Sequence, residues 1–321
     1  ATGLPPHLTG YWDNAHPYEG RLRSWMHELH DAGRQVVSIG KLHYRSTDAP
    51  TGFSPEILPM HVAGGAGDVS GSVRDPLPVR KGSRKLAEVL GPGETSYTKY
   101  DRAVRDAAID WLAKSGGIPS PEGWTLKVSF VAPHFPLVAP TEWYDRYASC
   151  DLMPRCPAPD SVVQHPWLAA MRTCYAYDNF SDDRRRLTLQ SYYALVSFLD
   201  ENIGQVLRAL EESGQAEQTD ILYLSDHGDN LGERGLWGKS TFFEDSAGIP
   251  MILSVAGQKT GRVCRTPVSL LDIYPTALEA AGLSGLPVGA NGQSLFQIAT
   301  ANDDPDRPVF GEYQAAPVMA P

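Results

Sequence analysis

Long apolar runs and clusters of basic residues are both missing from this 321-residue chain. A bilayer span needs about 20 consecutive apolar residues, and no stretch approaches that length, so we expect no membrane partner. Lys and Arg total 28 against 38 Asp and Glu, and they are dispersed along the sequence. Because nucleic-acid backbones are held by clustered Lys and Arg, this pattern argues against nucleic acid as a partner. A small anionic substrate remains compatible with the sequence.

Cysteine is scarce as well. Four cysteines are too few for a disulfide scaffold, and their spacing matches no familiar zinc ribbon. Cys150, Cys156, His165 and Cys174 share one Pro-rich segment that could form a zinc clip, but ordinary thiols are the expected state. With 42% hydrophobic and 21% charged residues, the composition fits one large or two small globular domains rather than a disordered chain.

Strand-like and helix-like segments alternate along the chain. Strands are predicted at 35–40, 126–132, 221–224 and 250–254. Amphipathic helices are predicted at 21–32, 96–114, 187–213 and 270–281. The Gly- and Pro-rich stretches 44–95 and 141–184 are predicted to be long surface excursions. This alternation predicts one α/β domain over residues 1–321, with a mostly parallel or mixed central sheet flanked by helices.

The most informative segment is ILYLSDHGDNLGERGLWGKSTFFED, residues 221–245. Its apolar start fits a buried strand, Asp226 and His227 follow directly, and a glycine-punctuated loop then reaches Lys239. Ligands in open α/β sheets bind at the carboxyl ends of strands. The pattern therefore predicts a site for a metal and an anion, although an Asp in this position can also simply stabilise a turn.

Two other predicted strands end in similar chemistry. QVVSIG leads to Lys41 and His43, and LKVSFVA leads to His134. If these strands are parallel neighbours of the strand before Asp226, their side chains share one pocket. Lysines supply positive charge for a tetrahedral oxyanion, and histidines donate protons or hydrogen bonds. Each residue alone is as readily structural as catalytic, so the prediction depends on their common position.

The predicted metal site is incomplete. Asp226 and His227 offer one oxygen and one nitrogen donor, which suits Mn²⁺ or Zn²⁺ as readily as Ca²⁺. At least two more carboxylates are required from elsewhere. Four charged residues near the motif are expected to form salt bridges that pin its loop: Asp229, Glu233, Arg234 and Glu244. In the opening loop, Asp13 and Asn14 are candidate substrate-binding residues, while a role for Asn14 in stabilising a turn is equally compatible.

Six motifs occur together in this chain: TGYWDN, IGKLHY, APHFPL, YYALVSFLDENIG, SDHGDNLGERGLWGKS and VSLLDIYPTALEAAG. In order and approximate spacing they resemble the type I sulfatases of the alkaline phosphatase superfamily, including choline-sulfatase-like and phosphonate monoester hydrolase relatives. The resemblance covers nearly the whole chain. It implies an alkaline phosphatase-like α/β sandwich and a divalent metal, Ca²⁺ before Mn²⁺.

The resemblance also implies roles for individual residues. Asp226 and His227 would belong to the metal shell, and Lys41 and His43 would flank the nucleophile. The remaining two catalytic candidates, His134 and Lys239, would contact the transferring group, with one of them protonating the leaving oxygen.

The chain departs from the family pattern at both ends. It contains neither the paired-Asp strand nor the C-x-P-S-R or S-x-P-S-R signature, whose Cys or Ser becomes the formylglycine nucleophile. None of its cysteines precedes a Pro-Ser-Arg run. Relatives also continue beyond its last residues, so 284–321 is a possible start of a small C-terminal subdomain. We therefore expect an internal fragment, with the formylglycine in a missing N-terminal part and little hydrolase activity in the chain alone.

Three functional hypotheses follow. The first is metal-dependent hydrolysis of small-molecule sulfate monoesters, with this chain carrying part of the site. The second keeps the same architecture but hydrolyses phosphonate or phosphate esters. The third is a non-catalytic protein that binds sulfated ligands. The compartment, cytoplasmic or periplasmic in a bacterium, and the oligomeric state stay open.

Overall fold

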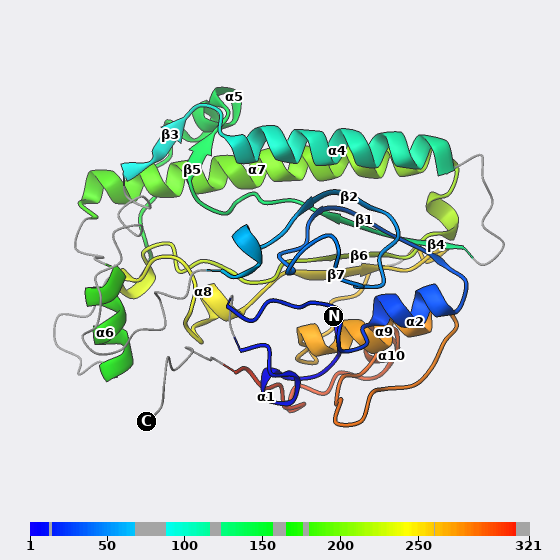
Figure 1. Cartoon of the computed structure of the whole chain (residues 1–321). Coiled ribbons are helices and arrows are strands. Elements are labelled where there is room, and N and C mark those ends of the chain that lie inside the picture. The colour runs from blue at the N-terminus through cyan, green and yellow to red at the C-terminus, as the bar shows by residue number, and fades with distance from the viewer. Residues whose placement is uncertain are drawn as a thin grey trace.

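A layer of strands lies between two layers of helices (Figure 1). The computed structural model describes residues 1–12, 15–67, 88–115, 123–156, 165–175, 180–259 and 261–312. The long helices α4 (Ser96–Ser115) and α7 (Asp182–Glu212) pack together on one face of the strands. The other face is covered by α2 (Trp25–Asp31), α9 (Ile273–Ala280) and α10 (Leu295–Thr300). The predicted α/β sandwich is confirmed.

The first half of the strand layer is a parallel sheet in the order β2-β1-β4. Its members are β1 (Gln35–Lys41), β2 (Glu56–Met60) and β4 (Trp124–Ser129). Central β1 pairs with a strand on each side, and five of its seven residues are buried. Val37 and Ile39 pack against Val104 and Ala108 of α4, which ties this sheet to the helical layer.

The second half is an antiparallel pair, β6 (Ile221–Leu224) with β7 (Met251–Ser254). The condition under which the sequence analysis predicted a shared pocket, that the strand before Asp226 is a parallel neighbour of the other two site-bearing strands, is not met among the described strands, since β6 pairs there with β7 alone. A cavity of about 2180 Å³ separates the halves, and every residue of β4 and β6 lines it. Residues on both strands stay half-buried for this reason.

The prediction of a continuous loop over 44–95 is also wrong. This stretch contains β2 and also β3 (Leu90–Pro92), which pairs in parallel with β5 (Leu137–Ala139). The β2 segment, EILPM, carries a proline and lies at the edge of its sheet, where a residue without an N–H is tolerated. Proline in a sequence usually indicates a loop, so the sequence analysis did not predict the edge strand β2.

Helix boundaries follow their capping residues. Helix α2 begins at Trp25 rather than at residue 21, because Ser24 and His27 form a capping box. Helix α7 begins at Asp182, five residues before its predicted start at 187, where Ser181 Oγ accepts the Arg184 N–H. Four short helices complete the described set: α1 (Pro6–Thr9), α5 (Thr141–Tyr144), α6 (Pro166–Tyr175) and α8 (Glu244–Ala247). Two of these, α5 and α6, lie in the predicted excursion 141–184.

Residues after 283 pack onto the second helical layer. Helix α10 contacts α9 and buries Leu295 and Ile298. Asp272 is fully buried, and its Oδ1 lies 2.7 Å from Arg307 Nη2. The start of a separate subdomain at residue 284 stays a prediction. Among the described helices, none combines the length and apolar character that crossing a bilayer demands.

Candidate active site

The end of β1 and the turn after it hold Lys41 and His43 in a constrained backbone. Gly40 has a φ of 103°, and a Cβ at this position would lie 2.2 Å from the Ser129 carbonyl oxygen. Only glycine permits β1 to approach β4 so closely in this conformation. His43 itself has a φ of 59°, and its N–H donates to the Met60 carbonyl at 2.9 Å. The turn is therefore fixed by both neighbouring strands.

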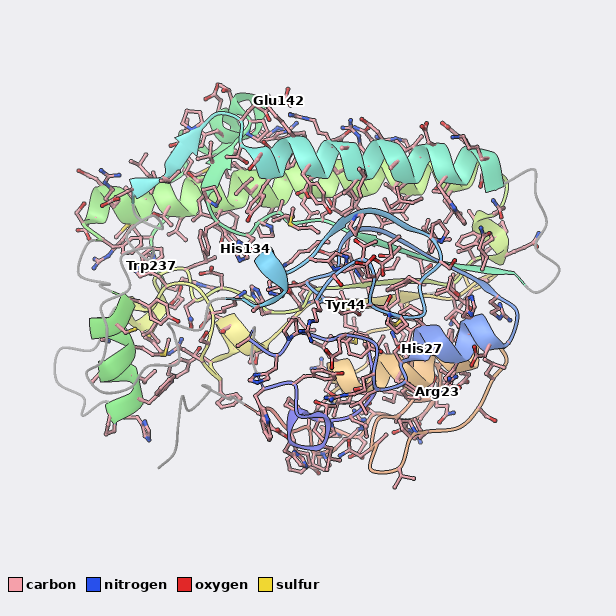
Figure 2. The ribbon with its side chains drawn as sticks, viewed as in Figure 1. Arg23, His27, Tyr44, His134, Glu142 and Trp237 are labelled. Carbon is pink, nitrogen blue, oxygen red and sulfur yellow. The ribbon has the colours of Figure 1, made fainter. Side chains whose placement is uncertain are left out.

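His134 lies in the loop after β4, at the same end of the molecule as Trp237 in the view of Figure 2. Its Nδ1 is 2.8 Å from the Phe135 carbonyl oxygen. A carbonyl only accepts, so Nδ1 carries the proton and Nε2 presents a lone pair. Burial, reinforced by Lys239 and Lys41, lowers the pKa of His134 to about 4. The imidazole is therefore neutral at pH 7.

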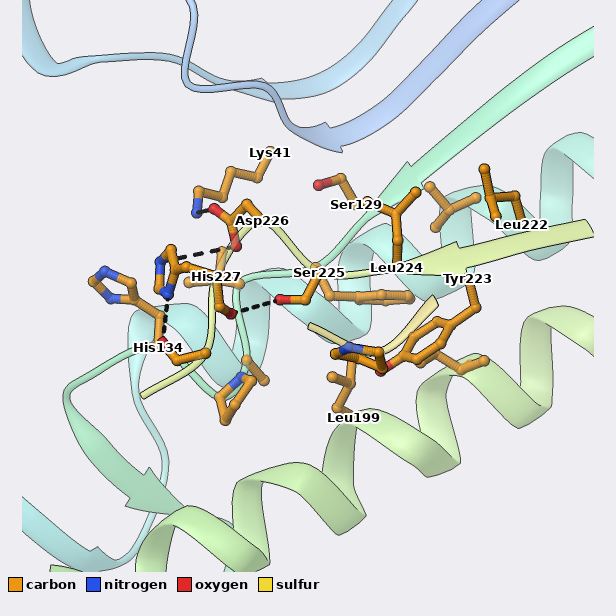
Figure 3. A pocket seen from close by; sticks show the side chains of 18 of the residues that line it. Lys41, Ser129, His134, Leu199, Leu222, Tyr223, Leu224, Ser225, Asp226 and His227 are labelled. Atoms are coloured by element: carbon orange, nitrogen blue, oxygen red, sulfur yellow. Dashed lines mark hydrogen bonds and ion pairs between the residues drawn. The ribbon is translucent and has the colours of Figure 1, made fainter. Parts of the chain in front are cut away.

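The segment after β6 contributes Asp226 and His227 to the site (Figure 3). Asp226 Oδ2 lies 3.7 Å from Lys41 Nζ, and Asp226 Oδ1 lies 3.8 Å from His227 Nε2. Lys239 Nζ is 2.7 Å from His227 Nε2. The His134 and His227 rings meet edge to face, with centroids 6.4 Å apart. Residues from three strand ends thus converge, as Figure 3 shows for Lys41, His134, Asp226 and His227.

Charges in this cluster favour an anion. Burial lowers the pKa of Lys239 and of His43, and nearby Lys41 lowers both further. Burial works against the ionised Asp226, but His227, Lys41 and Lys239 together hold the pKa of its carboxyl below the ordinary value. The arrangement presents two ammonium groups and neutral imidazoles around one carboxylate. Such a cradle suits a tetrahedral oxyanion.

Asp226 and His227 are placed to act as a pair of metal donors. His227 Nδ1 is 2.7 Å from the Gly228 carbonyl oxygen, so Nδ1 carries the proton and Nε2, which lies 3.8 Å from Asp226 Oδ1, presents its lone pair, the tautomer that a metal-binding histidine requires. Lys239 Nζ donates to His227 Nε2. Among the described residues, no group of three or more His, Cys, Asp or Glu side chains surrounds a common point. This statement includes the described members of the suggested zinc clip, and none of the four cysteines, all of them described, forms a disulfide.

The glycine-rich loop is pinned differently from the prediction. Arg234 and Asp245 form an ion pair at 2.8 Å. Asp229 instead accepts the N–H groups of Leu231 and Gly238, and Glu233 accepts two backbone N–H groups from residues 155 and 156. Burial raises the pKa of Asp229 to about 6. Backbone amides can satisfy these carboxylates because the loop folds back on itself, which the sequence pattern does not reveal.

The sequence analysis missed Lys127 on β4. Its Nζ donates to the Lys41 carbonyl at 3.0 Å and lies against the cavity. Burial, with a contribution from Lys41, lowers its pKa to about 8. A lysine inside the mostly apolar predicted strand LKVSFVA is the signal that could have identified this residue. Asp13 and Asn14, the predicted substrate-binding residues, lie outside the described residues, so their role stays a prediction.

Comparisons with known proteins identify the family of this chain. The Sulfatase family model matches residues 1–283. The chain is 32% identical over 330 residues to choline-sulfatase from Rhizobium meliloti, covering 99% of this chain and 64% of the relative. It is 26% identical to arylsulfatase K from Danio rerio, covering 91% of this chain and 56% of that protein. The chain therefore spans roughly three fifths of the length of these relatives.

A similar fold is found among solved structures. Phosphonate monoester hydrolase from Silicibacter pomeroyi aligns with a TM-score of 0.69 at 22% identity, covering 96% of this chain and 67% of that one. The chain belongs to the sulfatase family, whose fold is that of the alkaline phosphatase superfamily, and the resemblance drawn from the motifs is confirmed.

Proposed function

We propose that this chain supplies one part of the active site of a metal-dependent sulfate monoester hydrolase. The observation that carries the proposal is the convergence of Lys41, Lys239, His43 and His134 on the Asp226–His227 pair. Membership of the sulfatase family supports the choice of sulfate esters as substrates.

Each basic residue has a role in the proposal. Lys41 and Lys239 attract the sulfate oxygens, and preorganised cations of this kind act most strongly on the charge that develops in the transition state. His43 donates a hydrogen bond beside them. His134 is neutral at pH 7, so it requires a proton before it can act as a general acid.

Asp226 and His227 would hold the metal, with Ca²⁺ favoured and Mn²⁺ as the alternative. When bound, the ion would polarise the sulfate oxygens as a Lewis acid. Two donors do not complete a shell, so the others, and the formylglycine nucleophile, come from outside the described residues in this proposal. The cavity between β4 and β6 supports it, because an extended segment lying there would end beside Asp226.

A phosphonate ester hydrolase is the second candidate. The structural similarity to phosphonate monoester hydrolases concerns the fold alone, and His227 is the residue that favours this reading, since a nitrogen donor suits Mn²⁺ better than Ca²⁺. A catalytically silent protein that binds sulfated ligands is the third. Both keep the same cradle for a tetrahedral oxyanion.

The test is metal-dependent hydrolysis of a chromogenic aryl sulfate by the complete gene product that carries these residues, with a phosphonate monoester assayed in parallel. Lys239→Ala is expected to lower the rate by about 10²- to 10³-fold. Lys259→Ala, which removes an exposed lysine outside the site, is the matched control and should not change it. Faster phosphonate hydrolysis would favour the second candidate. Binding of the aryl sulfate without turnover would favour the third.

The 321-residue chain alone is the second arm of that assay. Little or no turnover is expected from it, because its sequence contains no C-x-P-S-R or S-x-P-S-R signature and its described residues include no group of three or more metal-ligating side chains. Robust metal-dependent release of product would contradict this and would mean that the chain contains a complete site.

A further inference from the structure

Helix α4 contacts the His134 loop through a buried carboxylate. Asp101, on α4, has a side chain that is only 1% exposed. Its Oδ1 accepts the Val131 N–H at 2.8 Å, and its Oδ2 accepts the Ala132 N–H at the same distance. These two amides lie two and three residues before His134. Both carboxylate oxygens are thus used to hold the start of this loop.

A second contact comes from the same face of the helix. Tyr97 lies one helical turn before Asp101, and residues four apart in a helix lie on the same side. The Tyr97 ring meets the His134 imidazole edge to face, with centroids 6.4 Å apart. On its other side, His134 stacks on Phe135 at 4.5 Å. The imidazole is therefore held between the helix and its own loop.

Burying the charged form of a carboxylate at this position costs free energy. Burial raises the pKa of Asp101 to about 6, even though its two amide partners favour the charged form. An apolar residue would avoid the cost but would leave two buried N–H groups unsatisfied. An asparagine would accept from one amide and present its own N–H₂ to the other. Only a carboxylate satisfies both amides, and those amides fix where the loop leaves the sheet.

We propose that Asp101 is a positioning residue for the His134 imidazole, with Tyr97 as the second contact through which α4 sets the orientation of the ring. Asp101 does not touch the oxyanion cradle. It acts by fixing Val131 and Ala132, and through them the position of the His134 ring against the His227 ring. The catalytic consequence rests on the proposed function, since it assumes that His134 contacts the bound ester. The positional consequence does not.

The first readout is the His134 ring itself. Selective ¹⁵N-histidine labelling gives signals for nine histidines, and loss of one set in His134→Gln identifies His134. In the unsubstituted protein we expect the pattern of a neutral ring protonated at Nδ1. Asp101→Asn is expected to shift this set toward a mixture of tautomers, with a smaller shift at His227, whose ring meets that of His134, and none at the other seven histidines. Asp110→Asn, the same change at an exposed position of α4, should shift none.

The second readout is turnover of the aryl sulfate by the complete gene product. Asp101→Asn is expected to lower kcat by about 10- to 100-fold with KM changed less than about twofold, because misplacing a reacting group by 1 Å costs that much. A folded Asp101→Asn protein with unchanged His134 signals would overturn the proposal. If that variant does not fold, Tyr97→Leu decides, and unchanged His134 signals there would overturn it equally. An unsubstituted protein without turnover would contradict the proposed function alone, since the ring signals still test the positioning.

Discussion

The two halves of the strand layer differ in how they are supported. In the β2-β1-β4 half, the central strand has a partner on each side, and its side chains pack under α4. The β6-β7 half is a two-stranded pair, and β6 faces the large cavity along its whole length. The candidate site draws Lys41, His43 and His134 from the first half and Asp226, His227 and Lys239 from the second. Its chemistry therefore depends on the alignment of two sheets that do not hydrogen-bond to each other among the described strands.

Removing one charged group from each half tests that dependence most strongly. Asp226→Ala and Lys41→Ala are each expected to lower hydrolysis of the aryl sulfate by at least about 10³-fold, which corresponds to several kcal/mol of transition-state stabilisation. Because the two side chains lie 3.7 Å apart, the double variant should lose much less than the product of the single losses. Independent, multiplicative losses would show that the halves do not act as one site. Steady-state kinetics of the three variants measures this.

Gly40 tests the closeness of β1 and β4. Gly40→Ala places a Cβ against the Ser129 carbonyl oxygen in a left-handed backbone, so we expect a loss of about 4 kcal/mol or more in the free energy of unfolding. Gly214→Ala is the control. Gly214 also has a positive φ but has open space around it, and it should lose about 1 kcal/mol. Similar losses in urea unfolding would contradict the close approach of the two strands.

Identical substitutions in the two sheets compare their packing directly. Ile39 on β1 is fully buried, and Ile39→Ala is expected to cost about 2–5 kcal/mol of unfolding free energy through lost contacts and a residual cavity. Ile252 on β7 is 61% exposed, and Ile252→Ala should stay within about 0.5 kcal/mol. Denaturant midpoints of both variants provide the measurement. A large cost at Ile252 would mean that another part of the protein covers β7.

A pH dependence of stability is expected from Asp101. The folded state holds its pKa at about 6 against an ordinary value of 3.8, so the folded protein binds the proton more tightly than the unfolded chain does. This contribution to stability is fully present below pH 3.8 and is lost as the pH rises through 6, by about 3 kcal/mol at most. The positive charge of Lys41 acts on Asp101 in the direction opposite to burial, and the pKa of Tyr100 is raised to about 12, well above this range.

The measurement is the difference in unfolding free energy between the unsubstituted protein and Asp101→Asn at pH 4, 5, 6 and 7. We expect this difference to change across the window, while Asp110→Asn follows the unsubstituted protein at every pH. A difference for Asp101→Asn that does not change with pH would show that burial does not raise the pKa of the Asp101 carboxyl group.

Much of the architecture was predictable because the controlling signals are local. The apolar run 221–224 agrees with β6 to the residue, and 35–40 predicts β1 to within one residue. The edge strand β2 was missed because a proline reads as a loop until a neighbouring strand is seen beside it. The pairing of β6 with β7 was also not predictable, since strand order depends on contacts that no local pattern specifies.

The candidate site was likewise predictable in part from the sequence. The sequence alone determined which residue types follow the strand ends, and so the chemistry: lysines, histidines and an aspartate that suit an oxyanion and a metal. Only the tertiary structure decided that Lys239 lies on His227, that Lys127 supports the turn after β1, and that Asp101 holds the His134 loop. The physical reason is distance along the chain. The residues that follow a strand are its neighbours in the sequence, so their position at the strand end can be predicted. Asp101 contacts Val131 only after α4 has packed on the sheet.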